Sequence, residues 1–66
     1  MIIEDTFTYH PPTPGQTKKY EEIRDKAKEF AYILWGQCPE SAEKTIALRR
    51  LQECVMFANA SIAINE

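Results

Sequence analysis

The sequence predicts an all-α protein: an antiparallel two-helix hairpin that follows an extended, proline-rich N-terminal arm. Three observations predict this fold: two apolar stripes at helical spacing, a short connector containing a proline between them, and a proline cluster near the start of the chain. The expected arm covers residues 1–16 and the expected hairpin covers residues 17–66, with helices over about 17–36 and 41–64.

The arm is predicted from the segment FTYHPPTPGQTKKY, residues 7–20. Pro11, Pro12 and Pro14 lack backbone donors and push the residues before them toward extended geometry, so no helix is expected before Thr17. The arm nevertheless carries two aromatic rings, Phe7 and Tyr9, and the only histidine of the chain. Disordered tails seldom contain aromatic residues at this density, so the arm is expected to have a binding or packing role.

The first helix is expected to begin at Thr17 as its N-cap and to stop near Gly36, and Pro39 prevents its continuation. Its apolar stripe advances by alternating steps of three and four residues: Tyr20, Ile23, Ala27, Phe30 and Leu34.

Ser41 is the expected N-cap of the second helix, with Glu43 in its first turn. The second stripe has the same spacing: Leu48, Leu51, Val55, Ala58 and Ile62. Because the connector is short, the two helices are expected to be antiparallel neighbours.

Length, cysteine content and charge exclude several classes of protein. At 66 residues the chain is one domain at most, and a chain of this size buries only ~60% of its surface on folding. The spacing of Cys38 and Cys54 matches no zinc pattern; a disulfide is not expected, and Cys54 is predicted to be a buried free thiol. No membrane span or signal peptide is visible, which indicates a soluble intracellular protein. The net charge of −2 argues against DNA or RNA as a partner, although a small anion could still occupy a local basic pocket.

One hairpin cannot cover all of the apolar residues. The residues off the two stripes are Tyr32, Ile33, Trp35, Ile46, Met56, Phe57 and Ile64. Some of them could be ordinary exposed side chains. Because the surplus is large and falls on several faces, we expect a homo-oligomer with Trp35, Met56 and Phe57 as interface anchors.

Catalysis has little support in the sequence, because no nucleophile–base set and no glycine-rich phosphate loop are present. Binding has more: Tyr9 and His10 are flat rings that could stack on nucleobases, beside prolines that stiffen the segment. Arg24 and Lys28 lie four residues apart on one helix face and could hold a phosphate, whereas Lys26 lies on another flank.

Plainer roles remain open for these residues. Tyr9 and Phe7 could pack the arm against the hairpin, and His10 could be a surface residue. Arg24 and Lys28 could form ordinary surface ion pairs, which contribute little to stability.

The segments FTYHPP, IRDKAK, CPESAEK and FANASIAINE together resemble the short hairpin family of phage anti-CBASS proteins. These proteins act as sponges that sequester the cyclic oligonucleotide signals of bacterial CBASS defence, and a Thoeris anti-defence sponge shares the same hairpin. The resemblance implies a homo-hexamer in the cytoplasm of the host bacterium, without enzymatic activity, cofactor or metal. It also implies cyclic dinucleotide pockets between protomers, in which a tyrosine stacks on the base and a basic side chain binds the phosphate. These roles correspond to Tyr9 and most simply to Arg24, with Lys26 and Lys28 as competitors.

Two positions depart from residues that members of this family often have. Phe57 replaces a tryptophan and keeps an aromatic anchor, whereas Ile64 replaces a basic residue that resembles one used for cyclic trinucleotides. Ile64 cannot bind phosphate, so it could instead extend the subunit interface. Two other functions stay open: a sponge for an NAD-derived Thoeris signal, and a helical protein-interaction module.

Overall fold

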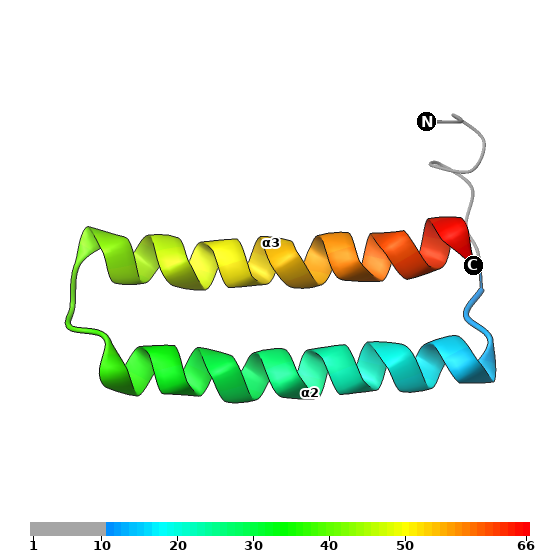
Figure 1. Ribbon diagram of the computed structural model, residues 1–66, viewed down its shortest axis with the longest axis horizontal. Helices are drawn as coiled ribbons and strands as arrows, with labels where there is room; N and C mark the ends of the chain where they lie inside the picture. Colours follow the sequence, from blue (N-terminus) through cyan, green and yellow to red (C-terminus); the bar gives the residue numbers. More distant parts are fainter. Residues whose placement is uncertain (1–10) are drawn as a thin grey trace.

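The computed structural model describes residues 11–66 and contains two α-helices in this range. Helix α2 (Pro14–Gln37) and helix α3 (Ala42–Asn65) each have 24 residues, and they lie side by side in opposite directions (Figure 1). No strand occurs in the described part of the chain. The predicted all-α hairpin is therefore confirmed, while residues 1–10 of the predicted arm lie outside the described residues.

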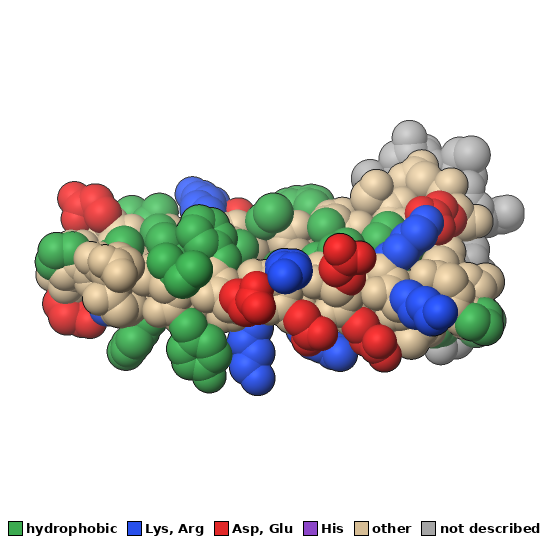
Figure 2. Space-filling model, turned by 60° about the horizontal axis from the view of Figure 1, so that its bottom comes forward, with side chains coloured by type: hydrophobic (Ala, Val, Ile, Leu, Met, Phe, Trp, Pro, Cys, Tyr) green, Lys and Arg blue, Asp and Glu red, His purple; other side chains and the backbone are tan. Residues whose placement is uncertain are grey.

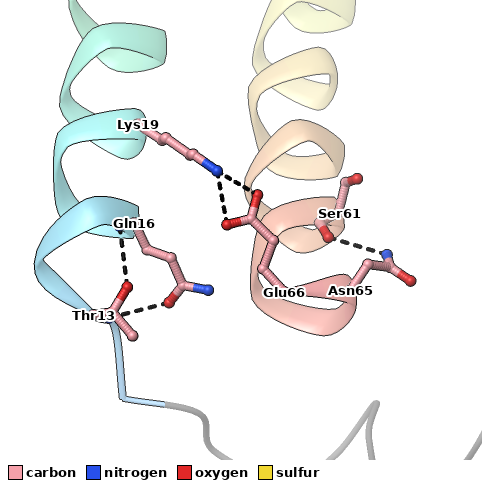
Figure 3. Close-up of polar contacts among 6 residues, drawn as sticks. All are labelled: Thr13, Gln16, Lys19, Ser61, Asn65 and Glu66. Atoms are coloured by element: carbon pink, nitrogen blue, oxygen red, sulfur yellow. Dashed lines mark hydrogen bonds and ion pairs between the residues drawn. The ribbon is translucent and has the colours of Figure 1, made fainter.

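Helix α2 begins earlier than the sequence pattern predicted. Its N-cap is Thr13, whose Oγ1 accepts a hydrogen bond from the Gln16 backbone N–H at 3.2 Å, and the Thr13 N–H donates to Gln16 Oε1 at 3.1 Å (Figure 3). This pair is a capping box, and it is followed by Pro14 at the first helical position. The prediction that the helix starts at Thr17 was wrong. Pro14 can occupy the first position of the helix, because a backbone N–H at that position would have no partner within the helix. Thr17 instead lies inside the helix, and its hydroxyl donates to the Thr13 carbonyl at 3.1 Å.

The connector and the start of α3 agree with the sequence prediction. Ser41 is the N-cap of α3, because its Oγ accepts from the Lys44 N–H at 3.1 Å, and Glu43 lies in the first turn. The Ser41 hydroxyl also donates to the Pro39 carbonyl at 3.1 Å, which holds the connector in its bend. Helix α2 runs one residue past Gly36, the expected stop.

The two helices meet along the predicted stripes, with one exception. The half-buried side chains of α3 include all five predicted ones, Leu48, Leu51, Val55, Ala58 and Ile62. In α2, Phe30 is 50% exposed, and the half-buried neighbour Ala31 takes its place at the interface. Steps of three and four residues from Ala27 both follow a helical stripe, so spacing alone could not separate Phe30 from Ala31.

The expected surplus of exposed apolar side chains is present. No hydrophobic side chain of the described residues is fully buried. The exposed large ones are Phe30, Tyr32, Ile33, Trp35, Ile46, Met56, Phe57 and Ile64. On the face drawn in Figure 2, large hydrophobic side chains gather toward the connector end, and charged side chains interleave over the rest.

Cys54 is exposed, so the prediction of a buried thiol was wrong. It precedes the stripe residue Val55, and one helical residue turns the side chain by ~100°, which directs Cys54 away from the partner helix. Cys38 and Cys54 are both free thiols. Within residues 11–66, neither helix is long and apolar enough to span a bilayer.

The open end of the hairpin is closed by an ion pair. Lys19 Nζ donates to both carboxylate oxygens of Glu66, at 2.8 and 2.7 Å, which joins the start of α2 to the end of α3 (Figure 3). Both side chains are about half exposed, so the pair contributes little free energy.

Candidate functional site

Two open hollows adjoin on one side of the seam between α2 and α3. We name the first the central hollow; it has a volume of about 380 Å³ and is lined by Arg24, Ala27, Lys28, Ala31, Leu48, Leu51, Gln52, Val55 and Met56. We name the second the connector hollow; it has a volume of about 360 Å³ and is lined by Lys28, Ala31, Tyr32, Trp35 and Leu48. Lys28, Ala31 and Leu48 belong to both hollows, which therefore form one continuous groove.

The central hollow follows from where small and long side chains fall on the helices. Ala27 and Ala31 lie four residues apart on α2, so both contribute only a methyl group to the floor. The long side chains of Arg24 and Lys28 have the same spacing and form one rim, and Met56 contributes from α3. The result is an apolar floor with two cations at its edge.

Of the three cations predicted to bind a ligand, the structure brings Arg24 and Lys28 together and leaves Lys26 apart. Both Arg24 and Lys28 line the central hollow, and Lys26 lines neither hollow. Lys26 lies two residues from each of them, which turns its side chain by ~200° around the helix axis. Its ammonium pairs with Glu29 at 3.5 Å instead.

Surface ion pairing, the plainer role considered for Arg24 and Lys28, is weak in the structure. Arg24 Nε lies 3.9 Å from Asp25 Oδ1, and both side chains are largely exposed. Lys28 forms no ion pair with any residue between 11 and 66. Within residues 11–66, neither Arg24 nor Lys28 is therefore held by a strong ion pair, which leaves both cations available to an anionic ligand.

The aromatic half of the predicted site is not placed by the structure. Tyr9, His10 and Phe7 lie outside the described residues. The described part of the site consists of the two cations, the apolar floor and the rings of Tyr32 and Trp35 at the connector end.

Sequence reasoning missed Lys44, the one charged side chain of the described residues that is buried, at 6% exposure. Its Nζ donates to the Trp35 carbonyl at 2.9 Å and to Glu40 Oε1 at 2.6 Å, and it lies 4.1 Å from the centre of the Trp35 ring. One signal could have revealed it: the last turn of α2 contains no basic residue, although its free carbonyls favour one. Lys44 supplies that charge from the next helix.

Asn59 has a polar atom without a partner. Its Oδ1 is buried and accepts no hydrogen bond from the described residues. A buried oxygen without a hydrogen bond lowers the stability of the fold. A hydrogen bond from a donor outside the described hairpin to Asn59 Oδ1 would therefore be favourable.

The comparisons with known proteins agree with this architecture. A family model described as "Acb2/Tad1, hairpin domain" matches residues 2–63. The matched range contains all of α2, nearly all of α3 and the predicted ligand-binding residues. No curated protein and no solved structure shows significant similarity to the chain.

Proposed function

Because the chain belongs to the Acb2/Tad1 hairpin family of anti-CBASS and anti-Thoeris sponges, we propose that it sequesters cyclic oligonucleotide second messengers. Cyclic dinucleotides are the first expected ligands. Binding without cleavage in the cytoplasm of the infected bacterium would keep these signals from their CBASS effectors. A phage protein with this activity counters the host defence by lowering the concentration of free signal.

The observation that carries this proposal is the pair of cations on the rim of the central hollow. Arg24 and Lys28 lie at the edge of an apolar floor, and Lys28 has no acidic partner among residues 11–66. A nucleotide offers the complementary chemistry, because its base has flat faces that pack on apolar surfaces and its phosphate is anionic. Arg24 can bind a phosphate through two hydrogen bonds, and Lys28 adds a second positive charge.

Tyr9 and His10 complete the proposed site from the arm. In this proposal Tyr9 stacks on a base, as the family resemblance implies, and His10 lies beside it. Arg24 is the first candidate for the phosphate contact and Lys28 the second. Lys26 is the weakest of the three because it lies on another flank and already pairs with Glu29.

Self-association is part of the proposed function. The central hollow, at about 380 Å³, is open and lies near the lower end of the ~300–1,000 Å³ range of small-molecule pockets. A second copy that closes it would increase the buried surface of the ligand and slow its release. We propose a homo-hexamer in which Met56, Phe57 and Ile64 of α3 contribute to the interfaces, since all three side chains are exposed in a single hairpin. Trp35, the fourth residue expected at the interface, lines the connector hollow.

Isothermal titration calorimetry with a panel of cyclic di- and trinucleotides tests the proposal. We expect heat with at least one cyclic dinucleotide, and chromatography afterwards should recover that ligand intact. The panel also includes an NAD-derived cyclic nucleotide, because the matched family covers anti-Thoeris sponges. Binding of that compound alone would replace CBASS with Thoeris as the target.

Native mass spectrometry of the same samples gives the number of subunits and the number of ligands bound. An absence of heat across the whole panel would contradict the sponge proposal and favour a protein-interaction module. Turnover of any panel compound would contradict binding without cleavage.

A further inference from the structure

We propose that the connector hollow is a second ligand site that takes a single nucleotide unit. Its base would stack against the indole of Trp35 beside Tyr32, and its phosphate would bind the ammonium of Lys28. Among residues 11–66, the lining of this site does not include Arg24. It shares Lys28 with the central hollow, and it differs from that hollow in the aromatic side chains that would contact the base.

The indole of Trp35 is held in place although it is exposed. The Trp35 side chain is 62% exposed, yet Lys44 lies 4.1 Å from the centre of its ring. Lys44 is itself fixed by hydrogen bonds to the Trp35 carbonyl and to Glu40. A ring that is already ordered loses less conformational entropy when a ligand binds, so the free-energy cost of binding is smaller.

Tyr32 adds a second aromatic surface to the same hollow. It lies three residues before Trp35 on α2, a spacing that puts both side chains on neighbouring positions of the helix surface. Its side chain is 69% exposed. Aromatic side chains in this arrangement bind bases of any sequence, because every base has a flat face.

The positive charge of Lys28 favours a small anion over a second copy of the chain as the occupant of the connector hollow. It lines the hollow and has no ion-pair partner among residues 11–66. An apolar protein surface placed over the hollow in the absence of a bound anion would bury this charge without compensation, which is costly. A phosphate compensates the charge, so the charge of the site favours a nucleotide.

The size of the hollow favours one nucleotide unit. Its volume of about 360 Å³ is near the lower end of the range for small-molecule pockets. One base with its sugar and phosphate suits such a space better than a ring of two or three nucleotides.

Fluorescence titration with adenosine monophosphate tests this site, because Trp35 is the only tryptophan of the chain. We expect saturable quenching of Trp35 emission after correction for absorption by the base. Lys28→Gln should raise the apparent Kd about tenfold or more, because it removes a charge-assisted hydrogen bond. Adenosine without phosphate should bind wild type as weakly as adenosine monophosphate binds this variant.

Arg24→Gln is the matched control, because it makes the same change of charge on the same helix but lies outside the connector hollow. We expect this variant to keep the wild-type quenching curve. Circular dichroism of both variants confirms that the helices are intact. The proposal is overturned if millimolar adenosine monophosphate leaves the emission unchanged, or if quenching is insensitive to Lys28→Gln.

A blue shift of emission that grows with protein concentration, without quenching, would show that a second copy covers the hollow, and it would also overturn the proposal. The sponge function is judged separately from the calorimetric panel. Wild-type protein that binds no cyclic nucleotide but shows Lys28-dependent quenching would contradict only the sponge function. The opposite result would contradict only the connector site.

Discussion

Lys44 Nζ lies 4.1 Å from the centre of the Trp35 ring and donates a hydrogen bond to the Trp35 carbonyl at 2.9 Å. The two residues come from different helices, so one side chain joins the end of α2 to the start of α3. The last turn of α2 contains no basic residue of its own. Lys44 therefore provides the positive charge that the free carbonyls of this helix end favour.

Lys44→Met should lower the free energy of unfolding by about 1–3 kcal/mol, because the variant leaves the partly buried Trp35 carbonyl without its donor and removes the charge at the end of α2. Chemical denaturation followed by circular dichroism measures this change. Lys26→Met is the control, since Lys26 is exposed and should change the stability by less than about 0.5 kcal/mol. Equal losses in the two variants would contradict the role of Lys44.

Glu40→Gln should have a small effect on stability, below about 1 kcal/mol, although Glu40 Oε1 lies only 2.6 Å from Lys44 Nζ. The Glu40 side chain is 83% exposed, so solvent screens the attraction. Denaturation at low and high salt measures it, and the difference between variant and wild type should shrink at high salt. A loss as large as that of Lys44→Met would show that the carboxylate, rather than the carbonyl and the indole, holds Lys44.

Thr13→Ala should destabilise the protein by about 0.5–2 kcal/mol, because it removes the N-cap acceptor of α2. Thr17→Ala should cost less, since Thr17 lies inside the helix and its hydroxyl only supplements a backbone bond to the same carbonyl. Thermal unfolding of the two variants under identical conditions provides the comparison. The reverse order would place the start of the helix at Thr17.

Arg24→Gln should weaken cyclic dinucleotide binding about tenfold or more, because a charge-assisted contact to phosphate is lost at the central hollow. Lys26→Gln makes the same change of charge two residues away, on a flank that lines neither hollow, and should bind as wild type does. Calorimetry with the tightest ligand of the panel measures both variants. If Lys26→Gln is the weaker binder, the phosphate lies on the opposite flank of α2.

Phe57→Ser should shift the protein toward smaller assemblies, because Phe57 is 74% exposed in a single hairpin and is expected to be covered by another copy. Cys54→Ser is a control on the same helix, since it changes an exposed side chain with little apolar surface. Light scattering over a range of protein concentrations measures the mass of both variants. A wild-type protein that is monomeric throughout would contradict the oligomer itself.

Local patterns predicted the helices well because each stripe alternates steps that keep apolar side chains on one face. They failed where one pattern permits two outcomes. Phe30 and Ala31 both continue the stripe of α2, and only the orientation of α2 against α3 turns the smaller residue toward the interface. Pro14 is compatible with a turn or with the first position of a helix, and the bonds between Thr13 and Gln16 select the helix.

The candidate site, like the fold, was only partly predictable from the sequence. That Arg24 and Lys28 share a face, and that Lys26 does not, follows from helical geometry and was predictable from their spacing. The hollow beneath them was not, because it also needs Leu48, Val55 and Met56 from α3. The amino-acid sequence by itself determined two amphipathic helices, the turn between them and a surplus of apolar side chains, since these depend on neighbours along the chain. Only the tertiary structure decided that Lys44 is buried against Trp35 and that the two cations border a shared groove, because such contacts depend on how one helix is placed against the other.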